Sequence, residues 1–253
     1  MNKRTDRIGE VRYNTYGSKM KIVDYVSVDK VKVYFEKYDY YTYATYHNFL
    51  KGLIKCPYNP VAYGVGYLGI GKYQSKIKGI PTNAYRCWYH MLERCYSKKY
   101  HKLYPTYTDC NVDSKWHNFQ NFAKWYHENY YEFKDEKLHL DKDILSKGNK
   151  IYSEDTCVFV PQSINILFTK SNSIRGKYPI GVTYNKKKNK YISRISKFNT
   201  NKQLGMFNTI KDAFFCYKHE KELHIKYVAD LYKHVIPTKL YTAMYKYQVE
   251  ITD

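Results

Sequence analysis

The chain has 253 residues, of which 43% are hydrophobic and 26% charged, and its formal net charge is +20. It contains no apolar run near the length of a membrane span, and its first residues do not form a signal sequence. We therefore expect an intracellular protein with no membrane partner, folded either as one large domain or as about two to three small ones. A basic excess of this size favours a polyanion, above all nucleic acid, as the partner.

The charge is unevenly spread along the chain. Residues 1–80 hold 14 basic residues against 6 acids, residues 81–169 hold 12 against 11, and residues 170–253 hold 17 against 6. The centre is thus almost neutral, whereas both flanks are basic. This distribution favours a carboxylate-rich site between two segments that contact phosphates.

The N-terminal part, residues 1–80, is predicted to be a β-rich module. Hydrophobic residues alternate over residues 21–25 and 30–35, which indicates an antiparallel hairpin, and residues 46–54 have the spacing of a short helix. The stretch from 57 to 81 is rich in glycine and proline. This module adds either DNA contacts or contacts with a partner protein, and the sequence leaves both open.

Two helices with aromatic stripes are predicted in the central part. The first starts at Pro81 and Thr82 and buries Trp88, and the second contains Trp125 and Asn129. The apolar positions recur at helical spacing, as such stripes do in a protein core. The positions are Trp88, Met91, Leu92, Cys95, Trp116, Phe119, Phe122 and Trp125.

Six cysteines are present, and no two of them form a Cys-x-x-Cys pair. That spacing argues against a zinc ribbon, and an intracellular location argues against disulfides. Buried thiols are the favoured interpretation. A zinc site built from Cys87, His90, Cys95 and Cys110 stays open as the alternative.

The most informative segment runs from residue 138 to residue 165. If residues 138–144 are extended, His139, Asp141 and Asp143 share one face, and two carboxylates beside an imidazole suit a hard divalent cation. A Ser-Lys-Gly-Asn turn, a short apolar strand over 157–160 and a helix started by Pro161 follow, with Asn165 one turn inside. This layout of two strands and a helix is that of a β-β-α-metal nuclease site.

The motifs of residues 81–170 resemble those of phage-borne HNH-type (His-Asn-His) endonucleases in order and spacing. The residues that carry the resemblance are Trp88, Met91, Arg94, Cys95, Tyr107, Cys110, Trp116, Phe119, Phe122, Leu140, Asp141, Lys142, Asp143, Tyr152, Ser153, Cys157, Phe159, Val160 and Asn165. The resemblance implies a phage-encoded protein that acts in the cytoplasm of a bacterial host. It also implies a Mg²⁺ or Mn²⁺ cofactor and cleavage of double-stranded DNA, with a homing role as one option.

Site roles follow from the same resemblance. Asp141 matches the metal-binding aspartate, and Asp143 or Asn165 is the second candidate ligand, while Asn149 matches the loop amide. Lys142 stands where the family has its general-base histidine, and no histidine follows Asn165.

The catalytic roles of His139 and Lys142 differ, and two functions are open. His139 is the imidazole nearest in sequence that can act as general base, and Lys142 is the candidate for electrostatic stabilisation of the phosphate. The enzyme interpretation is preferred. The alternative is a catalytically silent protein on a nuclease scaffold that binds DNA or a host protein.

The steepest charge lies between Lys170 and Lys202, a stretch with ten basic residues and no acid. Strands are predicted over 180–184, 191–195 and 203–207, followed by a helix that Thr209 or Asn208 caps and that extends to about Lys233. The candidate DNA-binding residues within it are Lys186, Lys187, Lys188, Lys190, Arg194 and Lys197.

Three strands and a packed helix with this pattern resemble the ethylene-response-factor (apetala-type) DNA-binding domain. The motif residues are Gly181, Val182, Tyr191, Arg194, Ile195, Leu204, Gly205, Phe207 and Ala213. The resemblance implies that the sheet enters the major groove, which makes Lys190, Arg194 and Lys197 candidates for base contacts. Lysines 186 to 188, in a turn, are assigned to phosphates.

The predicted fold class is α+β in three modules: a β-rich module over 1–80, an HNH-like nuclease module over 81–170, and an apetala-like DNA-binding module over 171–253. The tail that begins at Pro237 is predicted to add a strand over 247–251.

Overall fold

A computed structural model describes residues 7–169, 176–198 and 200–253 of the chain. The structure contains helices together with strands that form several small sheets, so the predicted α+β class is confirmed. The chain forms two compact units, Met1–Glu128 with Ile151–Ser153, and Asn129–Lys150 with Glu154–Asp253. The division into three modules remains a prediction.

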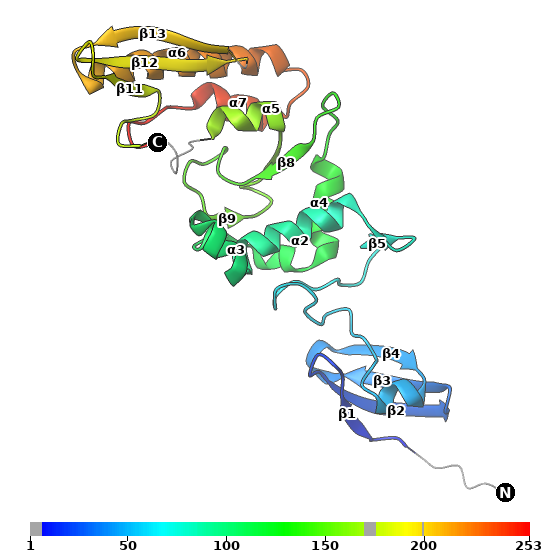
Figure 1. The fold of residues 1–253 in the computed structure, drawn as a ribbon. Helices are drawn as coiled ribbons and strands as arrows, with labels where there is room; N and C mark the ends of the chain where they lie inside the picture. Colours follow the sequence, from blue (N-terminus) through cyan, green and yellow to red (C-terminus); the bar gives the residue numbers. More distant parts are fainter. Residues whose placement is uncertain (1–6, 170–175, 199) are drawn as a thin grey trace, which may run out of the picture. The chain divides into compact units, whose positions relative to one another are not determined.

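Four antiparallel strands follow one another as a meander at the N-terminal end of the chain (Figure 1). They are β1 (Val11–Tyr13), β2 (Lys19–Ser27), β3 (Lys30–Phe35) and β4 (Tyr40–Ala44), with a 3₁₀ turn η1 (Glu36–Tyr38) before β4. Every second residue of β3 is buried, as are Met20 and Ile22 in the first half of β2, because side chains alternate between the two faces of a strand. Helix α1 (Tyr46–Leu50) covers the buried face through Phe49. The predicted hairpin and short helix are thus confirmed.

The first unit continues with the aromatic helices α2 (Asn83–Tyr96) and α4 (Phe119–Asn129). Thr82 caps α2, since its hydroxyl accepts a hydrogen bond from the Tyr85 amide. The predicted stripe is confirmed: Trp88 is fully buried, and its indole N–H donates to the Trp116 carbonyl at 2.7 Å. The smaller elements of this part are the hairpin β5 (Lys76–Ile77) and β6 (Ile80–Pro81), helix α3 (Lys98–Leu103), the 3₁₀ turns η2 (Pro105–Tyr107) and η3 (Ser114–His117), and the parallel pair β7 (Asn111–Val112) and β9 (Ile151–Tyr152).

The second unit contains the predicted pair of strands and short helix. Strand β8 (Leu138–Asp141) pairs antiparallel with β10 (Val158–Pro161), and α5 (Gln162–Asn165) with the 3₁₀ turn η4 (Ile166–Phe168) follows at once. All of β10 is buried, whereas β8 buries Leu138 and Leu140 only. The prediction that the strand continues to Ile144 is wrong. It ends at Asp141, where the side chain accepts backbone hydrogen bonds and turns the chain.

A three-stranded antiparallel sheet and a long helix form the other part of the second unit. The elements are β11 (Val182–Asn185), β12 (Lys190–Lys197), β13 (Thr200–Phe207), α6 (Ile210–Tyr232) and α7 (Thr238–Lys246). Helix α6 covers one face of the sheet (Figure 1), and the Thr209 hydroxyl caps it as predicted. Gly181 has a φ of +76°, and the Tyr217 ring fills the place of its missing side chain, so only glycine fits there.

The tail differs from its prediction. Residues 247–251 form no strand, and α7 precedes them, starting after Pro237 with Leu240 and Met244 buried one turn apart. Val249 is nevertheless buried in the core between the sheet and α6. The apolar residues of the tail therefore pack as expected, but in a helix and an irregular segment.

Candidate functional site

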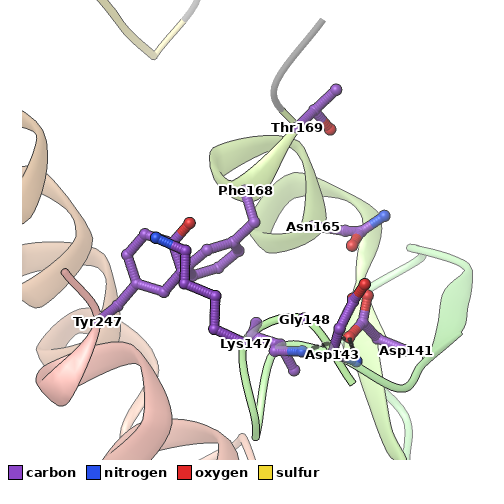
Figure 2. A pocket seen from close by; sticks show the side chains of 9 residues that line it. Asp141, Asp143, Lys147, Gly148, Asn165, Phe168, Thr169 and Tyr247 are labelled. Carbon is purple, nitrogen blue, oxygen red and sulfur yellow. Dashed lines mark hydrogen bonds between the residues drawn. The ribbon is translucent and has the colours of Figure 1, made fainter. Parts of the chain in front are cut away.

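The end of β8, the turn after it and the end of α5 surround a pocket of about 250 Å³. Asp141, Asp143 and Asn165 line its mouth, and Figure 2 shows the Asn165 amide directed at the two carboxylates. The remaining lining residues are Ile144, Lys147, Gly148, Phe168, Thr169 and Tyr247. The structure thus brings together all three residues that the sequence suggested as metal ligands.

Asp141 is held rigidly by the turn that it starts. Its Oδ1 accepts hydrogen bonds from the amides of Asp143 at 2.9 Å and Ile144 at 2.7 Å. Burial, together with the nearby charge of Asp143, raises the pKa of Asp141 from 3.8 to about 6. The ionised form is thus held at an energetic cost, which a cation in the pocket would offset.

Lys142 does not line the pocket. It is 6% exposed, and its Nζ donates to Asp143 Oδ2 and to the Asn149 carbonyl, both at 3.0 Å. In return, the Asn149 side chain donates to the Lys142 carbonyl at 2.6 Å. Both residues, predicted to take part in catalysis, are brought together, and the contacts that they make fix the two ends of the 143–148 loop.

His139 and Asp141 share one face of β8, as predicted, but His139 does not line the pocket. It sits in the middle of β8, opposite Val160 in the register, and among the described residues the pocket lining contains no histidine. The predicted shared face with Asp143 required an extended chain to Ile144. Because the chain turns after Asp141, Asp143 reaches the pocket from a loop instead.

The wall opposite the carboxylates comes from residues that the sequence analysis did not select. Lys147 Nζ bonds to Asp253 Oδ2 at 2.8 Å and to the Gln248 carbonyl at 3.1 Å, and it lies 5.3 Å from the centre of the Tyr247 ring. Phe168 packs edge-on against Tyr247. Burial raises the pKa of Tyr247, so its hydroxyl stays protonated. Tyr247 lies about 100 residues from the pocket loop in sequence, and no local pattern indicates this contact.

The donor set of the pocket fits a hard cation. Two carboxylates and an amide oxygen are ligands of the kind that Mg²⁺ and Mn²⁺ take, with water and a phosphate oxygen to complete the shell. Among the described residues, His, Cys, Asp and Glu form no group of three or more with the geometry of a metal site. The zinc alternative from Cys87, His90, Cys95 and Cys110 is therefore not assembled, and all six cysteines are thiols.

The C-terminal sheet separates the predicted DNA-binding residues. Lys186, Lys187 and Lys188 are exposed at the turn between β11 and β12. By strand alternation, Lys190 and Arg194 lie on the face away from α6, where Lys190 bonds to the Asn208 side chain.

Lys197 lies on the other face of this sheet. Its Nζ donates to Glu220 of α6 at 2.8 Å, and this hydrogen bond lowers the pKa of Glu220. Lys197 therefore links the sheet to the helix and does not join Arg194. Lys170, where the predicted basic segment begins, lies outside the described residues.

The face around Arg194 carries polar side chains beside the buried Ile192 and its ladder partner Met206. Arg194 is exposed and pairs with Gln203 across the ladder, while Ser196 pairs with Asn201 and Lys190 with Asn185. These side chains donate and accept hydrogen bonds, as base edges and phosphates require. The stretch between Lys186 and Lys202 contains no acid.

Comparison of the chain with protein-family models, with curated proteins and with solved structures found no match. In the part of the chain that the structure describes, no helix combines the length and the apolar character needed to cross a bilayer.

Proposed function

We propose that this protein is a metal-dependent endonuclease that binds double-stranded DNA through its C-terminal sheet and hydrolyses a phosphodiester at the Asp141 pocket. The observation that carries the proposal is the convergence of Asp141, Asp143 and Asn165 at the end of a β-β-α arrangement. A hard cation held there would polarise the scissile phosphate and stabilise the leaving oxygen.

The chain's own residues divide the work at this pocket. Asp141 is the fixed ligand, because two backbone amides hold its Oδ1 and leave Oδ2 to face the pocket. Asp143, whose side chain is 49% exposed, is the carboxylate that can accept a hydrogen bond from an attacking water. Asn165 completes the oxygen ligands from α5. Lys142 and Asn149 act as positioning residues, since they hold the loop and do not line the pocket.

Binding of DNA is assigned to the basic turn and the open face of the C-terminal sheet. Exposed lysines at a turn neutralise phosphates without reading sequence, whereas Arg194 on a sheet face has the geometry for a base contact. Together these residues would bind the DNA and position it at the Asp141 pocket, which has few positive charges of its own.

A second function, DNA binding without cleavage, is favoured by one specific observation. Lys142 already neutralises Asp143 at 3.0 Å, and the pocket lining among the described residues includes no imidazole base. A scaffold of this kind can bind DNA, or a host protein, after its chemistry is lost. The two functions differ only in whether cleavage occurs.

The test is incubation of the wild-type protein with supercoiled plasmid and Mg²⁺, Mn²⁺ or Zn²⁺, beside a sample in EDTA. The proposal expects nicked or linear product with Mg²⁺ or Mn²⁺ and none in EDTA. Asp135→Asn is the matched control, because Asp135 is an exposed acid of the same unit outside the pocket. Lack of cleavage with all three metals, with DNA binding retained, would support the silent binder.

A further inference from the structure

We propose that the exposed face of the N-terminal sheet binds single-stranded DNA by stacking bases on tyrosines between lysines. The choice of DNA over RNA rests on the proposed function. The existence of a single-strand site rests on the sheet alone.

The face is defined by the register of β1 to β4. Residues paired across an antiparallel ladder point to the same side, and the pairs Lys21 with Tyr34, Tyr34 with Tyr41, and Lys32 with Tyr43 therefore share one face. Met20, Ile22, Val31, Val33 and Phe35 occupy the opposite, buried face. The residues of the exposed face are Val11, Tyr13, Lys19, Lys21, Asp24, Ser27, Lys30, Lys32, Tyr34, Tyr41 and Tyr43.

Aromatic rings are presented to solvent across this face. Tyr13, Tyr41 and Tyr43 are 65%, 48% and 56% exposed. Tyr34 and Tyr41 stack with ring centres 4.4 Å apart and planes 21° from parallel. Exposed rings aligned in this way offer flat surfaces on which unpaired bases stack, and duplex bases are not available for such contacts.

Two lysines lie beside two of these rings. Lys32 Nζ lies 5.1 Å from the centre of the Tyr41 ring, and Lys30 Nζ lies 5.2 Å from that of Tyr43. Such exposed contacts are weak, so a base can displace the ammonium group, which then remains beside the ring for a phosphate.

The charge of the face stays positive after its acids are counted. Lys19 bonds to Glu36 at 3.2 Å, and Asp24 lies opposite Lys32 in the register. The Tyr34 hydroxyl also donates to Asp39 Oδ1 at 3.2 Å, so four lysines face three acids. The lysines complement the phosphates of a single strand, and the aromatic rings complement its bases. An acidic protein surface would leave the rings unmatched, and an apolar one would leave the lysines without a counter-charge.

The experiment measures fluorescence anisotropy of a labelled oligothymidylate of about ten nucleotides with the full-length protein in EDTA. The double variant Tyr41→Ala/Tyr43→Ala should bind it about tenfold to 100-fold more weakly and bind a duplex of equal length unchanged. The Tyr41→Phe/Tyr43→Phe variant should bind like wild type, because stacking needs the ring and not the hydroxyl. Tyr227→Ala is the matched control, since Tyr227 is 57% exposed on α6, which belongs to the other compact unit.

Equal losses from the Tyr227 control and the double variant, or no loss from either, would overturn the proposal, as would tighter binding of oligouridylate RNA. Circular dichroism of each variant shows whether the sheet stays folded. The outcome is separable from that of the endonuclease proposal: a wild-type protein that cuts no plasmid contradicts the nuclease, while a tyrosine-dependent loss on the single strand still supports this site.

Discussion

The Lys142 ammonium and the Asp143 carboxylate are neighbours in sequence and form an ion pair of 3.0 Å in which the lysine side chain is 7% exposed and the aspartate side chain 49%. Asp143 therefore has two tasks: it balances a buried charge and it faces the pocket. Asp141, two residues earlier, has its pKa raised by burial and by Asp143. The two carboxylates occupy one pocket in opposite electrostatic situations.

We predict that Asp143→Asn destabilises the metal-free protein. The substitution leaves the buried ammonium of Lys142 without its counter-charge, which costs several kcal/mol when both partners are buried. Because Asp143 is half exposed, water solvates the ammonium in part and lowers this cost. We expect the free energy of unfolding to fall by about 1 to 3 kcal/mol. Urea unfolding at pH 7.5 in EDTA measures it. An unchanged or higher stability would show that the ion pair contributes nothing.

Asp141→Asn should instead stabilise the metal-free protein. The pKa of Asp141 is raised from 3.8 to about 6, so the folded state holds this proton more tightly than the unfolded chain does. Its stabilising contribution is full below about pH 4 and is lost as the pH rises through about 6. Asparagine keeps the Oδ1 that accepts the two amides and removes the charge. The variant should be more stable than wild type by about 1 to 3 kcal/mol at pH 7.5 and similar near pH 4, in the same urea assay. A difference that does not depend on pH would contradict the assignment.

Divalent metal should stabilise the wild-type protein through this pocket. A ligand at 100 times its Kd adds about 2.7 kcal/mol. Thermal unfolding with Mg²⁺ or Mn²⁺ should show a rise in Tm that EDTA reverses and that weakens below pH 6, where Asp141 takes up a proton. Asp141→Asn should lose the rise, and Asp135→Asn should keep it. An equal rise in both variants would place the metal elsewhere.

We predict that three substitutions in the C-terminal sheet affect DNA binding in different ways. Arg194→Ala should lose about 1 to 3 kcal/mol on a cognate site and relax sequence preference, and Lys187→Ala should weaken all sequences alike and reduce the salt slope by about one. Lys197→Ala should leave the affinities for cognate and for other DNA nearly unchanged, because the Lys197 ammonium is hydrogen-bonded to Glu220. Binding titrations at several salt concentrations distinguish them. A large loss from Lys197→Ala would mean that the other face of the sheet contacts DNA.

Much of the local structure follows from local sequence. Alternation placed β2 and β3, helical spacing placed α2 and α6, and Thr82 and Thr209 mark two helix starts because a hydroxyl at that position accepts an amide hydrogen bond. These signals span only a few residues, so no knowledge of the rest of the chain is needed.

The errors arise where the outcome depends on distant contacts or on a single turn. The end of β8 at Asp141 depends on a side-chain turn that the apolar pattern through Ile144 hides, and this turn places Asp143 on a loop instead of on the strand face that His139 and Asp141 share. Tyr247 closes the pocket from far along the chain. Lys197 is different: strand alternation already separates it from Arg194, and that signal was present in the sequence.

Single-turnover cleavage of a labelled duplex by wild type, Asp141→Asn and His139→Ala, with metal-free binding of the same duplex, tests the central claim most directly. The proposed function predicts Mg²⁺- or Mn²⁺-dependent cleavage by wild type and a rate below detection for Asp141→Asn. It also predicts unchanged or slightly tighter binding by that variant, because a negative charge near the phosphate is gone. His139→Ala should cleave at close to the wild-type rate, since His139 does not line the pocket. Cleavage by Asp141→Asn at the wild-type rate, or a loss of about 10² or more from His139→Ala alone, would contradict the assignment of the chemistry to this pocket.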